Sequence, residues 1–111
     1  MAFQKKTPPI KIRLNINDFN KLVEVISIQS ENENEDIKNN SVRLKDKLLR
    51  YSIPFTNDDS VIIEIRFYTR EIAEMFYVLF NGIEDVEVKT NYYDVLVKVR
   101  ENIKNKKQDK E

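Results

Sequence analysis

Apolar and polar residues alternate without a break over residues 10–16, which predicts a strand with one buried and one exposed face. Asn17 and Asp18 follow this strand, and both are residue types that cap the N-terminus of a helix. The next apolar residues, from Phe19 onward, recur at helical spacing. We therefore expect an amphipathic helix that ends near residue 29.

The pattern is less regular in the middle of the chain. Residues 30–40 are polar and acidic, and we expect a mobile loop there. Residues 41–49 fit a short helix, but alternation begins at Leu49 and favours a strand over about residues 47–55. A polar turn at residues 56–59 and renewed alternation over residues 60–68 then predict a β-hairpin.

The C-terminal half begins with a strong helical signal. Thr69 can cap a helix over residues 69–80, which would end at the Asn81-Gly82 pair. Residues 86–89 and 95–99 each alternate between valine and other residues. With a turn at residues 90–94 between them, they predict a second hairpin.

The expected order of elements is β-α-β-β-α-β with one additional strand at the C-terminal hairpin. This order predicts an α+β fold of the ferredoxin-like, split βαβ type, with an antiparallel sheet of about five strands and two helices on one face. We expect one domain over residues 10–101, after an extended lead-in over residues 1–9 and before a charged tail over residues 102–111.

Such a fold leaves one face of the sheet without helices. The chain has 19 basic and 19 acidic residues, yet the positions expected on that face include seven basic and only three acidic residues. The seven basic residues are Lys11, Arg13, Arg50, Arg66, Lys89, Lys98 and Arg100. The surplus suits nucleic-acid phosphates or an acidic or RNA-bearing partner, and the alternative is a solvated face with no partner.

Three tyrosines add to this picture. Tyr68 is the one aromatic residue expected on the open face, whereas RNA-recognition sheets usually show two or three, so we do not expect base-specific readout. Tyr92 and Tyr93 lie at the expected tip of the second hairpin. They could anchor a protein partner, or one of them could pack back onto the hairpin.

The composition excludes several kinds of chemistry. The chain has no His, no Cys and one Gly, which excludes disulfides, thiol or histidine catalysis, Cys/His zinc sites and most phosphate-binding loops. We expect no cofactor, no metal and no enzymatic activity. The weaker alternative is a small nuclease with Asp85, Glu87 and Lys89 on one face of a strand. Without a membrane span or an apolar leader, a cytoplasmic protein is expected.

Two segments resemble known proteins. Residues 48–55 (LLRYSIPF) and 63–74 (IEIRFYTREIAE) are similar to segments of small accessory proteins on phages and conjugative elements of low-GC Gram-positive bacteria. That group includes anti-CRISPR proteins, which are commonly small, have one domain and are not enzymes.

The resemblance implies a non-catalytic protein that inhibits a host defence effector by steric block or sequestration. The effector that it indicates is a Cas9-type ribonucleoprotein. The chain's expected partner is a host protein or ribonucleoprotein, with RNA as a further candidate and no membrane. An edge strand near residues 47–55 or 94–101 could also pair two copies. The alternative function is a nucleic-acid-binding accessory factor for plasmid or phage transfer or replication.

Overall fold

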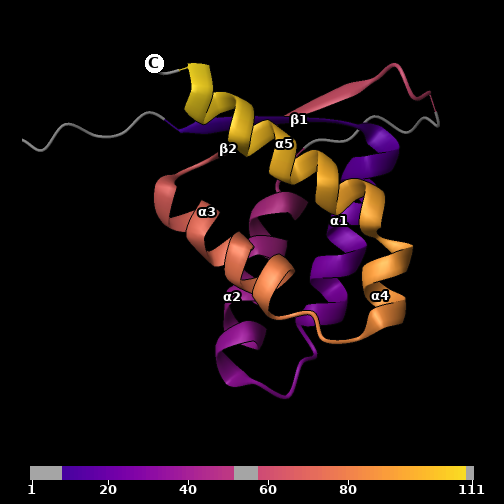
Figure 1. Ribbon diagram of the computed structural model, residues 1–111, viewed down its shortest axis with the longest axis vertical. Coiled ribbons are helices and arrows are strands. Elements are labelled where there is room, and N and C mark those ends of the chain that lie inside the picture. Colours follow the sequence, from indigo (N-terminus) through magenta and orange to yellow (C-terminus); the bar gives the residue numbers. More distant parts are fainter. Residues whose placement is uncertain (1–8, 52–57, 110–111) are drawn as a thin grey trace, which may run out of the picture.

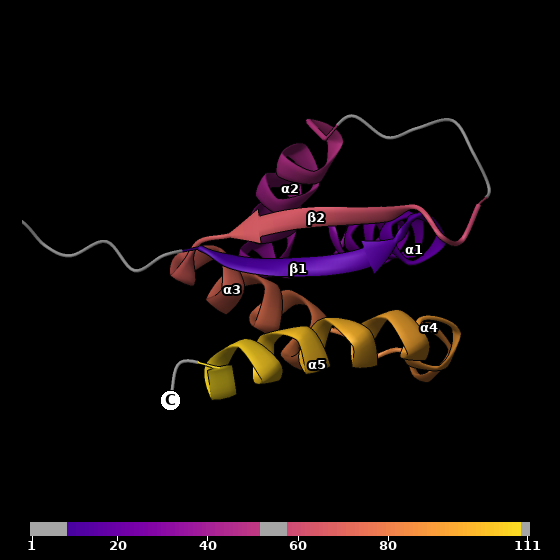
Figure 2. The same cartoon turned by 90° about the horizontal axis from the view of Figure 1, so that it is seen from above.

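Strand β1 (Ile10–Asn15) pairs antiparallel with strand β2 (Ile62–Phe67), so that Ile12 lies opposite Ile65 and Leu14 opposite Ile63. The structure is a computed structural model that describes residues 9–51 and 58–109. Figure 1 shows helices α1 (Ile16–Gln29), α2 (Glu35–Leu49) and α3 (Thr69–Phe76) below this sheet. Figure 2 shows α5 (Tyr93–Asp109) running along the β1 side of the sheet, after the short helix α4 (Val86–Asn91).

The sequence predicted the two strands and α1 as elements because each has a single clear period. The cap expected at Asn17 and Asp18 is wrong, since both residues lie inside α1 and its N-cap is Asn15. The inner face of the sheet is buried against the helices, and its residues are Ile12, Leu14, Ile63, Ile65 and Phe67. The side chain of Asn15 caps α1 by accepting a hydrogen bond from the backbone N–H of Asp18 at 2.8 Å. The strand and the helix therefore join at one residue with no loop between them.

The prediction of a five-stranded ferredoxin-like sheet is wrong. Across the described ranges the sheet has two strands. Residues 86–99, where the second hairpin was expected, lie in α4, in the junction at Tyr92 and in the first part of α5. Val95, Leu96, Val99 and Ile103 are buried along one side of α5. The same residues satisfy helical spacing, and the alternation of Val95, Val97 and Val99 is a coincidence of valine-rich composition. Residues 102–109, which we placed in a charged tail, continue α5.

The loop expected over residues 30–40 is wrong, because residues 35–40 form the first part of α2. The short helix that residues 41–49 fit is the second part of the same helix. Asn34 caps this helix through hydrogen bonds from the backbone N–H groups of Asp36 and Ile37. Its buried residues are Ile37, Ser41, Leu44 and Leu48. The strand expected over residues 47–55 is therefore wrong at residues 47–49, which belong to α2, and residues 52–57 lie outside the described part of the chain.

The helix predicted over residues 69–80 is present, but its N-cap is Tyr68 and not Thr69. Its last turn is π-helical (η1, Tyr77–Asn81). The buried side chain of Gln29 donates a hydrogen bond from Nε2 to the Val78 carbonyl at 3.1 Å, which ties this turn to α1. Within the described residues, no helix has both the length and the apolar character that crossing a bilayer requires.

Gly82 ends η1 at a position where a Cβ atom has no room. A Cβ added there would lie 2.9 Å from the Val78 carbonyl oxygen and 3.0 Å from Cδ1 of Ile37. We predict that Gly82→Ala lowers the free energy of unfolding by about 1–3 kcal/mol, because the backbone of η1 has to move. Urea denaturation measures this, with Asn81→Ala at the neighbouring exposed position as the control. Equal stability of the Gly82→Ala and wild-type proteins would contradict the close approach.

Candidate binding surface

The outer face of the β1–β2 sheet is open to solvent. Figure 2 shows the sheet in front of α1 and α2, with no described helix over the side that faces the viewer. The side chains on this side alternate with the buried ones. They belong to Lys11, Arg13, Asn15, Ile62, Glu64 and Arg66.

The charges on this outer face are arranged around one carboxylate. Glu64 lies directly opposite Arg13, and its Oε1 is 3.0 Å from Arg13 Nε, while Arg66 Nε lies 4.0 Å from the other oxygen. The hydrogen bond from Arg13 lowers the pKa of Glu64, and the charges of Lys11, Arg13 and Arg66 lower it further. Three cations therefore surround one anion, and the outer face keeps a positive surplus at neutral pH.

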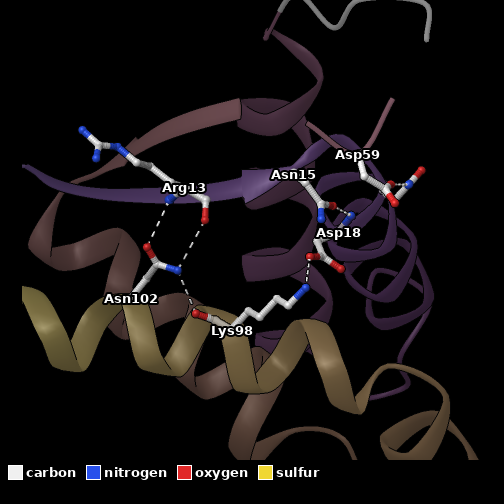
Figure 3. Close-up of polar contacts among 7 residues, drawn as sticks. Arg13, Asn15, Asp18, Asp59, Lys98 and Asn102 are labelled. Atoms are coloured by element: carbon white, nitrogen blue, oxygen red, sulfur yellow. Dashed lines mark hydrogen bonds and ion pairs between the residues drawn. The ribbon is translucent and has the colours of Figure 1, made fainter. Parts of the chain in front are cut away.

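The free edge of β1 is closed by a side chain from α5. Asn102 accepts a hydrogen bond from the Arg13 backbone N–H at 3.2 Å and donates from Nδ2 to the Arg13 carbonyl at 3.4 Å (Figure 3). The same Nδ2 donates to the Lys98 carbonyl at 2.9 Å, which holds the amide in place. Asn102 thus offers β1 the same donor and acceptor that a neighbouring strand would.

The free edge of β2 is capped in a similar way. The hydroxyl oxygen of Tyr51 accepts a hydrogen bond from the Arg66 backbone N–H at 3.0 Å. The Tyr51 ring is half-buried and packs edge-on against Phe19, with 6.5 Å between the ring centroids. Each edge of the sheet therefore has a backbone group occupied, at Arg13 in β1 and near the end of β2 at Arg66, which opposes the addition of a further strand there.

A polar cluster lies where β1 meets α1. The buried carboxylate of Asp18 binds the Nζ of Lys98, so that α5 is tied to the first turn of α1 (Figure 3). Asn17, one residue earlier, hydrogen-bonds Asp59. The hydrogen bond with Asp18 raises the pKa of Lys98 above its ordinary value of 10.5, and the charges of Asp18, Asp94 and Asp59 add to this effect. The cluster joins α1 to α5 and to the segment before β2. Its residues are not among those on the outer face of the sheet.

Two exposed apolar side chains lie at opposite ends of β2. Ile62 is 56% exposed at its start, and Tyr68 is 59% exposed immediately after its end. Lys47 lies 5.6 Å from the centre of the Tyr68 ring and forms an ion pair with Glu71 at 3.0 Å. The face thus combines cations with apolar contact area, and the Tyr68 ring is held by its neighbours.

The ten residues predicted as binding residues do not form one surface. Lys11, Arg13 and Arg66 share the outer face, and Tyr68 borders it. The other six lie on helices or directly after them. Arg50 follows α2, Lys89 is on α4 and Tyr92 follows it, and α5 carries Tyr93, Lys98 and Arg100. The prediction of a wide basic sheet face is therefore wrong, because the described parts of the segments expected as its further strands lie in or next to helices.

The expected Tyr92-Tyr93 hairpin tip is a junction between two helices. The hydroxyl of Tyr92 donates to Glu24 of α1 at 3.1 Å, and its ring packs against the core, whereas Tyr93 is 63% exposed. Asp85, from the nuclease alternative, caps α4 by accepting from the backbone N–H groups of Glu87 and Val88. Its carboxylate serves the helix, and the described residues contain no group of three acids placed to hold a metal ion.

Asn102 and Tyr51 are the residues of this surface that the sequence did not single out. Tyr51 lies within the strand expected over residues 47–55, and Asn102 lies within the expected charged tail. An asparagine on a helix has no sequence signal for an edge-capping role, because its partner Arg13 is 89 positions away.

We predict that Asn102→Ala lowers the free energy of unfolding by about 1–2 kcal/mol, because a polar group at the β1 edge loses its partner. Native-state hydrogen exchange should show faster exchange of the Arg13 amide, which donates to Asn102. Tyr51→Phe is the matched control, and it should affect the Arg66 amide instead. Unchanged exchange at Arg13 in Asn102→Ala would rule out the edge cap.

The ion pair of Lys98 with Asp18 predicts a dependence of stability on pH. Because the pKa of Lys98 is raised in the folded state, its stabilising contribution is complete below pH 10.5 and is lost as pH rises through the folded-state value. Urea denaturation should therefore show that wild type is more stable than Lys98→Met at neutral pH and that the difference shrinks at high pH. Tyr92, whose pKa is raised by burial and by Glu24, is present in both proteins and cancels in the difference.

Lys21→Met, which changes an exposed lysine of α1, is the control for this measurement. Its difference from wild type should stay nearly constant with pH. A Lys98→Met difference that did not change with pH would contradict the assigned ion pair.

Comparison of the chain with known proteins finds no relative. No protein-family model matches the chain, and no curated protein or solved structure matches it. The function therefore has to be argued from the open sheet face, its charges and its closed edges.

Proposed function

We propose that this chain is a non-catalytic binding protein that docks an anionic surface of its partner on the outer face of the β1–β2 sheet. The observation that carries the proposal is the open face itself, on which Lys11, Arg13 and Arg66 surround the single carboxylate of Glu64. Arginine is the cation best suited to this task, because its planar guanidinium binds carboxylates and phosphates with two parallel hydrogen bonds.

The closed edges support docking through the face. Strand addition needs a row of free backbone donors and acceptors, and Asn102 and Tyr51 already occupy backbone groups of Arg13 and Arg66. The exposed side chains of Ile62 and Tyr68 add apolar area at the two ends of β2. A partner with an acidic centre and apolar rims would complement this arrangement.

The partner class we propose is a Cas9-type ribonucleoprotein of a bacterial host, which the chain inhibits by steric block in the cytoplasm. Such an effector presents both RNA phosphates and protein carboxylates, and either suits the arginines. The resemblance to anti-CRISPR proteins supports this choice. One of its two segments, residues 63–74, includes Glu64, Arg66 and Tyr68 of the surface described above.

The test is inhibition of DNA cleavage by a purified Cas9-type ribonucleoprotein from a low-GC Gram-positive bacterium. We expect wild type to inhibit, and Arg13→Gln/Arg66→Gln to need about tenfold more protein for half inhibition, since buried arginine contacts commonly contribute that much. Lys21→Gln/Lys38→Gln removes two exposed cations from α1 and α2 and should inhibit like wild type. Circular dichroism verifies that all three proteins are folded.

Equal loss of inhibition in both double variants would contradict the assigned face, and no inhibition by wild type would contradict the inhibitor proposal. Gel-shift titrations with RNA and duplex DNA at several salt concentrations test the alternative accessory factor. Tight binding to bare nucleic acid that weakens steeply with salt would favour that alternative.

A further inference from the structure

A second surface lies away from the sheet, where η1, α4 and α5 meet. These elements enclose a hollow of about 230 Å³, and no residue of the outer sheet face lines it. Its apolar part includes Leu79 and Phe80 of η1 and Leu96 of α5, and Tyr93 lies on its wall. The proposed function does not use this hollow, so binding in the hollow is independent of it.

The floor of the hollow is firmly held. Leu79 and Leu96 are 2% and 8% exposed, so they belong to the core and cannot move freely. The Phe80 ring packs on Phe76 with 4.9 Å between the ring centroids. Leu79 and Phe80 come from the π-helical turn, a local geometry that is frequent at functional sites. An occupant would therefore meet a preformed apolar surface.

The rim of the hollow is positively charged. Lys89 of α4 and Arg100 of α5 are both lining residues, and the lining includes no acidic residue. The Arg100 guanidinium lies over the Phe80 ring, 4.7 Å from its centre, which fixes the cation beside the apolar floor. Tyr93, the first residue of α5, is 63% exposed and adds an aromatic side chain to the lining beside Lys89 and Arg100. The complementary occupant has an apolar body flanked by negative charge.

We propose that this hollow binds an acidic linear peptide segment of a partner protein, which inserts one large apolar side chain and places carboxylates beside Lys89 and Arg100. The volume favours a side chain over a larger ligand, since pockets for drug-sized molecules usually measure about 300–1,000 Å³ and this one measures about 230 Å³. An apolar anchor surrounded by charged contacts is a common arrangement in peptide recognition.

The experiment is a titration of the ¹⁵N-labelled full chain with the capped peptide Asp-Glu-Phe-Glu-Asp, followed by NMR. We expect chemical-shift changes centred on Leu79, Tyr93 and Leu96, because these residues line the hollow. Two further peptides provide comparison, one with serine in place of phenylalanine and one with glutamine in place of every acid. Both should bind about tenfold more weakly, because the first lacks the apolar side chain and the second lacks the carboxylates.

Variants of the chain complete the test. Arg100→Gln and Lys89→Gln should each weaken binding of the acidic peptide by about tenfold, and Lys21→Gln on α1 should leave it unchanged. The two rim variants lie on different helices, so an altered fold in one does not prevent the test with the other. Equal binding of the acid-free peptide, or shift changes confined to Lys11, Arg13 and Arg66, would overturn the proposal.

Discussion

The pairing of β1 with β2 is the constraint on which the rest of the structure depends. Within the described residues the sheet has two strands, so each strand is also an edge. An isolated pair of strands is at best marginally stable in water. The inner face is stabilised by burial of Ile12, Ile65 and Phe67, which are all 0% exposed. The edges need separate protection, and Asn102 and Tyr51 provide it with single side chains.

Helix α5 is central to the protection of the sheet edge because it contacts both β1 and α1. Asn102 caps β1, Lys98 binds Asp18 at the start of α1, and Val99 and Ile103 enter the core between these contacts. The spacing of one helical turn places Lys98 and Asn102 on the same side of α5, so that both reach the N-terminal part of the fold. The last helix of the chain therefore holds the first strand in place.

The same helix takes part in both surfaces for which we propose partners. Asn102 caps the edge of the sheet whose open face carries Arg13 and Arg66, and Arg100 lines the hollow. Both surfaces are cationic, although basic and acidic residues balance in the chain as a whole, with 19 of each. The zero net charge gives little long-range attraction, so recognition of an anionic partner depends on these local groups.

Some elements could be predicted from the sequence and others could not, and the difference has a physical cause. For β1, α1, β2 and α3, one period dominates, and burial follows it. Arg13 and Arg66 could be placed on an exposed face for the same reason. Helix α5 satisfies two periods at once, because Val95, Val97 and Val99 alternate while Val95, Leu96, Val99 and Ile103 follow a helix. Only the tertiary contacts, which bury the helical set, distinguish the two.

The composition by itself therefore excluded histidine and cysteine chemistry, and hydrophobic periodicity located β1, α1, β2 and α3. The same periodicity showed that cations alternate with buried residues on the two strands. The tertiary structure decided how many strands the sheet has, and it decided that Asn102 and Tyr51 close its edges. The physical reason is that an edge cap depends on two groups meeting across the fold. Hydrophobic periodicity reports which side of an element is buried, and it does not report which distant residue lies against it.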